Sequence, residues 1–245
     1  MHTYVKFLLL TSVVALVTSI WFSDSLPPLR AISEDLKSEP MQELIIQPAF
    51  EVTVNKIDYT VAPLYAYEIT GLVVSKHNAD TWWDYIHKRW NDSLNVTDLC
   101  VIWGNNVRSD VYAKVKFSSE SFTCNFRFNS QEVYDEFDMA AVSNNHLITG
   151  EPRIAKKLRN VQIGDQIRVK GMLAEYSHNH GFAFKRGTST VRTDTGNGAC
   201  ETVYVEDFEV IKSANPLWRN VRWAAIAMIL LGVVTWFALP MNNKP

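Results

Sequence analysis

Three side chains have the types that nucleophilic catalysis needs: Cys200, His146 and Asp194. In such a site a thiolate attacks, an imidazole takes and returns the proton, and a carboxylate orients the imidazole. Cys200 and Asp194 also have ordinary structural explanations. A cysteine beside Ala199 at the start of a strand is usually structural, and Asp-Thr-Gly is a turn-forming sequence. A Cys/His hydrolase is therefore one hypothesis among several.

His178 and His180 form a second candidate site, for a metal ion. Residues i and i+2 of a strand point to the same side, so both imidazoles could reach one ion. The same His-Asn-His-Gly run is typical of an exposed hairpin tip, which is the interpretation we favour. His77 and His87 could add ligands, but no spacing in the sequence places them nearby. Because no phosphate-binding, dinucleotide-binding or metalloprotease motif is present, we predict no cofactor.

Three segments are typical neither of plain strands nor of plain turns: residues 97–110, 143–148 and 192–201. We expect a binding surface there, formed by Trp103, Asp110, Asn145, His146, Asp194 and Glu201. Together these segments resemble a set of uncharacterised bacterial envelope proteins that are anchored in the membrane. The resemblance spans roughly residues 65–205 and implies kinship, without an activity.

The chain has an uncharged apolar run at each end, at residues 7–22 and 223–239. Lys6 precedes the first run, which is the arrangement of a signal peptide or a signal anchor. Since Trp21 and Phe22 occupy the place where small cleavage-site residues belong, we favour an uncleaved anchor. A buried soluble helix is a poor interpretation of the second run, which has no polar face.

These features predict the domain organisation. We expect an N-terminal anchor (1–22), a polar tether (23–49), one soluble domain (50–213), a C-terminal transmembrane helix (214–240) and a short tail (241–245). Lys6 and Lys244 favour both ends in the cytoplasm, whereas Arg219 and Arg222 favour the opposite orientation. The signal-like start leads us to place the domain outside the cytoplasm, in the periplasm beside the inner membrane.

The pattern of the soluble domain is mainly β with short helices. Apolar residues alternate through 65–75, 113–117, 122–128 and 201–211, as in half-buried antiparallel strands. Helices are expected at 81–90, where the tryptophans would pack in the core, and at 152–159. A short helix before a Gly-Asp turn and strand at 161–176 resembles OB-fold domains, which implies a five-stranded Greek-key barrel. A β-sandwich is the alternative fold.

Composition limits the function further. The formal net charge is −2, which provides no basic surface for a nucleic acid. The three cysteines allow at most one internal disulfide, or three buried thiols. We therefore expect a non-enzymatic binding or assembly module that acts at the membrane, with another envelope protein as its partner. The alternatives are the Cys/His hydrolase and a phage-exclusion or mobile-element component.

Overall fold

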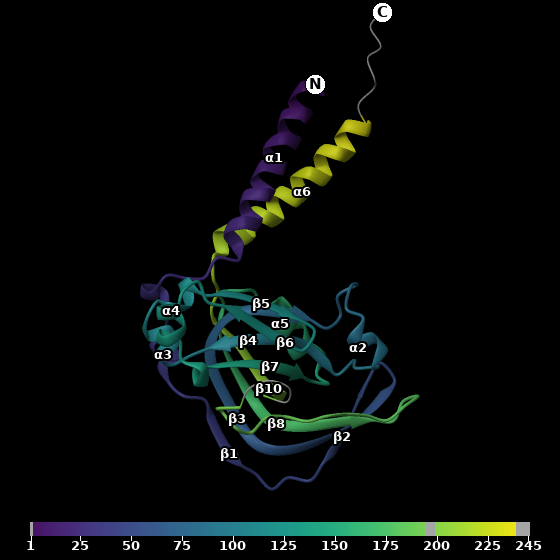
Figure 1. The fold of residues 1–245 in the computed structure, drawn as a ribbon. Helices are drawn as coiled ribbons and strands as arrows, with labels where there is room; N and C mark the ends of the chain where they lie inside the picture. Colours follow the sequence, from purple (N-terminus) through teal and green to yellow (C-terminus); the bar gives the residue numbers. More distant parts are fainter. Residues whose placement is uncertain (1, 195–198, 239–245) are drawn as a thin grey trace, which may run out of the picture. The chain divides into compact units, whose positions relative to one another are not determined.

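The computed structural model describes residues 2–194 and 199–238, which divide into two compact units. One unit contains both ends of the chain, up to Ser25 and from Ala214 onward, and the other runs from Leu26 to Ser213. Figure 1 shows two helices in the first unit and a curved sheet in the second. The mainly β character of the central region is confirmed.

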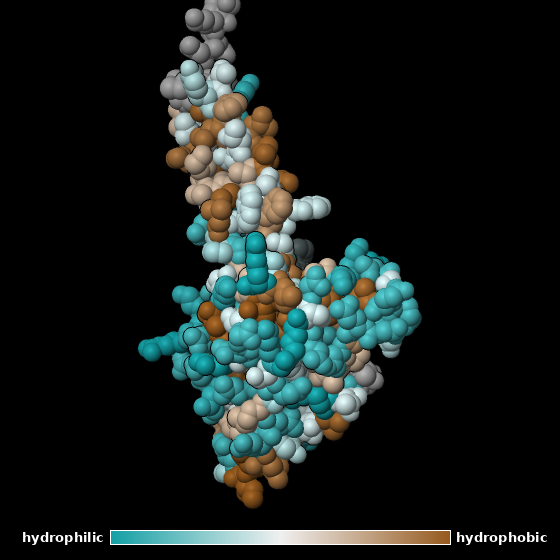
Figure 2. Space-filling model, turned by 90° about the vertical axis from the view of Figure 1, so that its left-hand side faces the viewer, coloured by the Kyte–Doolittle hydropathy of each residue, from teal (hydrophilic) through white to brown (hydrophobic). Residues whose placement is uncertain are grey.

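The terminal unit consists of helices α1 (His2–Ser23) and α6 (Pro216–Ala238). Both are long and apolar enough to cross a membrane, and apolar side chains cover much of their surface in Figure 2. They pack against each other through small residues: Ser12 and Ser19 of α1 and Ala225 and Gly232 of α6 are buried. Close approach at small residues is how apolar helices associate without a hydrophobic driving force.

The central unit is built on one large mixed sheet and a separate hairpin. The large sheet has the order β1-β3-β4-β7-β10-β8-β9, with β2 on β3 and a further pairing of β3 with β8. Its strands are β1 (Met41–Leu44), β2 (Phe50–Val54), β3 (Ile57–Asn78), β4 (Asn95–Ile102), β7 (Val142–Ile148), β8 (Gln166–His178), β9 (Phe184–Arg186) and β10 (Glu201–Lys212). Because β3 pairs with β4 and β8, five strands close a ring of pairings. Among the described pairings, only β7 with β10 is parallel.

Helices and turns connect these strands. The helices are α2 (Ile86–Arg89), α3 (Asn105–Arg108), α4 (Gln131–Glu136) and α5 (Pro152–Asn160), with short 3₁₀ turns at Leu29–Ala31, Glu34–Lys37, Val111–Lys114 and Met139–Ala141. The helix expected at 152–159 is confirmed: Pro152 begins it, and the Glu151 carboxylate caps it by accepting from the Arg153 N–H. The alternating segments at 113–117 and 122–128 correspond to an antiparallel hairpin of β5 (Lys116–Glu120) and β6 (Thr123–Arg127).

A disulfide joins this hairpin to the large sheet. Cys100 of β4 is bonded to Cys124 of β6. The bond lies beside an apolar cluster that includes Phe117, Phe126 and Phe137. Cys200 is left as a free thiol. Of the two cysteine arrangements that the sequence allowed, the protein therefore has the single disulfide.

The segment 81–90 corrects one expectation. The helix there is a single turn, Ile86–Arg89, and Trp82 and Trp83 are 83% and 61% exposed instead of lying in the core. The Asp84 carboxylate causes the difference. It accepts from the His87 N–H and from two imidazoles, so residues 81–84 form an irregular turn that leaves the indoles outside.

Residues 26–49, expected as part of a tether, pack on the domain. Leu36 is fully buried, and its carbonyl oxygen accepts from the Gly104 N–H at 2.9 Å. Strand β1 pairs with β3 in antiparallel register.

Gly171 provides a test of the ring. A Cβ there would overlap the Tyr204 carbonyl oxygen, a backbone atom of the neighbouring strand β10. We expect Gly171→Ala to lower the free energy of unfolding by about 1–3 kcal/mol through overpacking. Gly187→Ala is the matched control, because its Cβ would meet only a Glu175 carboxylate oxygen at 3.7 Å. Urea denaturation of the full chain measures both; equal stabilities of the two variants would contradict the close approach.

Candidate active site

The register of the sheet aligns polar side chains across four strands. Asp98 of β4 lies opposite His146 of β7, and His146 lies opposite Thr202 of β10. On its other side Asp98 lies opposite His77 of β3. Cys200 directly precedes β10 and lines the same cleft as His146. Four separate parts of the sequence thereby bring Cys200, His146, Asp98 and His77 into one region.

His146 and Asp98 form a buried pair. Nδ1 of His146 donates to Oδ1 of Asp98 at 2.7 Å, and neither side chain is exposed. Asp98 also accepts from the Asn95 amide at 2.9 Å and from the Phe122 N–H at 2.8 Å. Phe122 reaches it because the hairpin turns there with a positive φ of 64°. Three donors therefore hold this carboxylate in one orientation, which in turn orients the imidazole.

The pair shifts both pKa values toward the charged forms. Burial alone lowers the pKa of His146, but the charge and hydrogen bond of Asp98 outweigh it and raise the pKa from 6.5 to about 9. Burial alone raises the pKa of Asp98, but His146 and Asn95 outweigh it and lower the pKa to about 2. Asp98 thus stabilises the imidazolium form of His146, which is the form that a proton arriving from a thiol would create.

Cys200 lies beside the same imidazole at the wall of one cleft. Its thiol helps to raise the pKa of His146, and its sulfur donates to the Phe122 carbonyl oxygen at 3.9 Å. The amide nitrogen Nδ2 of Asn144 lies 3.6 Å from the sulfur. An amide so placed can donate to an oxyanion that forms on a carbonyl attacked by this thiol. Cys200, His146, Asp98 and Asn144 thus bring together the residue types of a cysteine nucleophile, a base, an orienting acid and an oxyanion donor.

Arg186 of β9 completes the surroundings of His146. Its Nη2 donates to Nε2 of His146 at 2.6 Å, and its guanidinium lies 3.8 Å from the centre of the Phe122 ring. Arginine has no acceptor, so this hydrogen bond requires the neutral imidazole with its hydrogen on Nδ1, and Arg186 thereby opposes the imidazolium that Asp98 favours. His146 can take a proton on Nε2 only when Arg186 moves away. Arg186 therefore controls access to the base.

These residues open onto a cleft of about 840 Å³. Its walls include Trp90, Phe122, Asn144, His146, Lys185, Arg186, Asp194 and Cys200. All three residues considered for catalysis from the sequence thus line one cleft. Asp194, however, accepts from the Ser189 hydroxyl at 2.5 Å, and Asp98 is the acid that contacts His146.

The other predicted binding residues lie elsewhere. Asn145 and Glu201 alternate with His146 and Thr202, so they occupy the opposite face of the sheet. Glu201 pairs with Arg192 at 3.0 Å, and the same guanidinium lies 5.3 Å from the ring of the fully buried Trp103. Burial raises the pKa of Glu201 to about 7. Asp110 is exposed, 3.7 Å from Lys114.

The two histidines considered for a metal do not share one. Nε2 of His178 donates to the Trp90 carbonyl oxygen at 2.9 Å, and Nδ1 accepts from the His180 N–H at 3.1 Å. Both ring nitrogens of His178 are therefore occupied, and His180 is exposed. The cluster that could hold a metal is a different one, formed by His77, Asp84 and His87.

Sequence reasoning missed two parts of this region. Asp98 lay inside a segment singled out for binding, but its role depends on pairing with a strand 48 residues away. The Asp84-x-x-His87 spacing was a usable signal, since residues three apart in a turn meet. Comparisons with protein-family models, with curated protein sequences and with solved structures find no match.

Asp98→Asn tests the buried pair. Because the native pKa of His146 is raised from 6.5 to about 9, the pair stabilises the fold fully below pH 6.5 and loses this contribution as the pH rises through 9. We expect the variant to lose about 3 kcal/mol of unfolding free energy on the acidic side of neutrality and progressively less toward pH 9. Urea denaturation across this range measures the difference. The exposed Asp110→Asn is the control, and a loss independent of pH would contradict the coupling.

Proposed function

We propose that the chain is a membrane-anchored, cysteine-dependent enzyme of acyl transfer, most simply a hydrolase. One observation carries the proposal: the free thiol of Cys200 and the imidazole of His146, which Asp98 orients, line the wall of one cleft. A carboxylate-oriented imidazole activates a cysteine nucleophile once the thiol comes within hydrogen-bond reach of the ring.

The steps follow from these contacts. His146 takes the thiol proton on Nε2, and the thiolate of Cys200 attacks the acyl carbon while the Asn144 amide donates to the oxyanion. When the bond from carbon to the leaving group breaks, the imidazolium gives its proton to that group, and a thioester remains. Water then gives a proton to His146 and attacks the thioester, which releases the acid; the imidazolium returns the proton to the thiolate. Asp98 stays ionised throughout and stabilises the imidazolium.

The cleft indicates an anionic substrate with an apolar part. Arg186 provides positive charge, Lys185 adds an ammonium that pairs with Glu175 at 2.8 Å, and Trp90 and Phe122 provide aromatic surface. An anionic group near Arg186 would draw the guanidinium away from Nε2 of His146. Substrate binding would then free the base at the moment that it is needed, which couples recognition to activation.

The location and the finer fold are part of the same proposal. Two terminal helices would anchor the chain in the inner membrane, with the central unit in the periplasm. The Cys100–Cys124 disulfide supports this side, since such bonds persist in oxidising compartments.

We also infer that the ring of β3, β4, β7, β10 and β8 is an OB-like Greek-key barrel. Helix α5 between β7 and β8 supports this inference.

A non-enzymatic binding module is the second candidate. The contact of Arg186 with Nε2 favours it, because this contact blocks the base. In this case an acidic surface of another envelope protein would occupy the cleft through Lys185 and Arg186. Binding would then not need the Cys200 sulfur.

Alkylation of Cys200 by iodoacetamide tests the enzymatic proposal. Cys200 is the one free thiol among the three cysteines, all of which lie in the described residues, so the label is specific. We expect His146→Gln to slow alkylation at neutral pH about tenfold, because the imidazole no longer promotes the thiolate. Mass spectrometry of the intact chain measures the rate.

His178→Gln is the matched control, since it removes another largely buried imidazole whose nitrogens face the Trp90 carbonyl and a backbone N–H. In this variant Cys200 should be alkylated at the natural rate.

A p-nitrophenyl ester then tests acyl transfer: one equivalent of nitrophenol should be released in a burst, and Cys200→Ala should abolish the burst. Equal alkylation rates together with no burst would exclude the enzyme and leave the binding module.

A further inference from the structure

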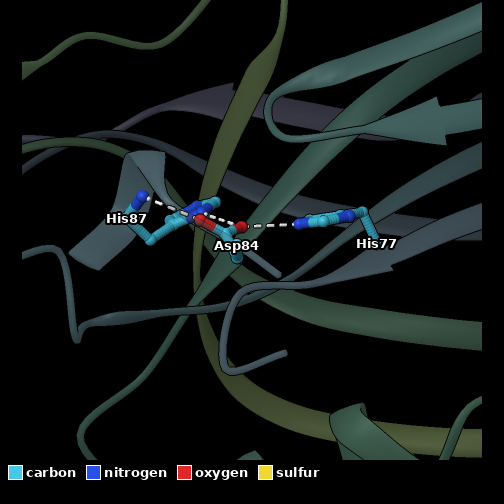
Figure 3. A group of neighbouring side chains, drawn as sticks. All are labelled: His77, Asp84 and His87. Atoms are coloured by element: carbon cyan, nitrogen blue, oxygen red, sulfur yellow. Dashed lines mark hydrogen bonds and ion pairs between the residues drawn. The ribbon is translucent and has the colours of Figure 1, made fainter. Parts of the chain in front are cut away.

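A second cluster of polar side chains lies beside the cleft and takes no part in the proposed acyl transfer. His77 of β3, Asp84 of the irregular turn and His87 of α2 each offer one ligand atom, and these atoms lie within 4.8 Å of one another. Figure 3 shows the Asp84 carboxylate between the two imidazoles. The rings are nearly parallel, with centres 6.2 Å apart.

The convergence is on a single oxygen. Oδ2 of Asp84 lies 2.6 Å from Nε2 of His77 and 2.7 Å from Nδ1 of His87. The Ser121 hydroxyl lies 3.1 Å from the same oxygen. The other oxygen, Oδ1, accepts from the His87 N–H at 2.9 Å. Two imidazole nitrogens and a carboxylate oxygen that already point at one small volume are a preformed donor set for an ion.

From this geometry we propose a divalent transition-metal site with Nε2 of His77, Oδ2 of Asp84 and Nδ1 of His87 as ligands. Imidazole and carboxylate together suit Zn²⁺ and its neighbours, whereas Ca²⁺ and Mg²⁺ prefer oxygen ligands alone. The Ser121 hydroxyl, 3.4 Å from Nε2 of His77, lies where a fourth ligand or a bound water would be held.

Asn95 provides an independent observation in support. Asn95 is only 3% exposed, and its Oδ1 has no hydrogen-bond partner among the described residues. At present Nδ2 of Asn95 donates to Nε2 of His87, which keeps the hydrogen of this ring on Nδ1. A metal on Nδ1 requires the hydrogen on Nε2 and therefore an acceptor beside it. The unpaired Oδ1 supplies that acceptor if the amide turns.

Rotation of the Asn95 amide would also affect Asp98 and thereby link the two sites. It would break the hydrogen bond from Asn95 to Asp98, while Asp98 keeps those from His146 and the Phe122 N–H. The metal site is buried: Asp84 and His87 are each only 2% exposed. An ion held by His77, Asp84 and His87 would fasten the 79–90 segment to β3, and the Ser121 hydroxyl beside it belongs to the hairpin that carries Phe122.

The test uses the untagged full chain in detergent, treated with a chelator and titrated with CoCl₂ alone. We expect one equivalent of Co²⁺ to give the visible bands of a low-symmetry, four-coordinate site and to raise the unfolding temperature. His87→Gln should weaken Co²⁺ binding by more than about 100-fold, since even partners of ligands are worth 10- to 100-fold. His180→Gln, which removes an exposed imidazole outside the cluster, should bind as the natural chain does.

Because His87 is buried, its variant could lose binding through misfolding. His77→Gln is the second variant, at a side chain that is 10% exposed. A variant counts only if its unfolding temperature in chelator matches that of the natural chain in chelator. The proposal is overturned if the natural chain shows no Co²⁺ bands, or if these bands persist unchanged in a folded His77→Gln or His87→Gln variant. Cys200 alkylation, measured without metal, keeps the acyl-transfer proposal separately testable.

Discussion

The burial of the Asp98 carboxylate is the constraint on which the rest of the site depends. A charge removed from water is tolerable only when hydrogen bonds and an opposite charge replace the lost hydration. Asp98 receives both from three different elements: His146 of β7, Asn95 at the start of its own strand, and the Phe122 N–H of the hairpin turn. Each donor must hold its place, so the sheet and the hairpin are fastened around one carboxylate.

The disulfide acts in the same place. Cys100 lies two residues after Asp98 on β4, and Cys124 lies two residues after Phe122. The covalent bond therefore fixes the hairpin where the Phe122 N–H must meet Asp98. Phe122 in turn contacts His146, His87 and Arg186 through its ring. The hairpin therefore packs over the polar network through Phe122.

This network joins the two proposed sites without merging them. From His77 it runs through Asp84, His87, Asn95 and Asp98 to His146 by successive hydrogen bonds. The cleft opens at the His146 end, whereas the opposite end is closed. Cys200 and His146 lie at the end that is open to the cleft, whereas Asp84 and His87 lie at the buried end. A buried polar group that loses its hydrogen-bond partner destabilises the fold, so the loss of one hydrogen bond in this network changes the energy of the others.

Local patterns in the sequence were sufficient for several of the elements of secondary structure. Alternation predicted the strands, Pro152 predicted a helix start, and two uncharged runs predicted the terminal helices, because these signals depend on neighbours in the chain. The same reasoning chose Cys200 and His146 by residue type but paired them with Asp194, which contacts Ser189 instead. It also placed Trp82 and Trp83 in the core. Only the tertiary structure decided these points, because the parallel pairing of β7 with β10 and the opposition of β4 to β7 set which side chains meet. A shift of one residue would turn each of them to the other face.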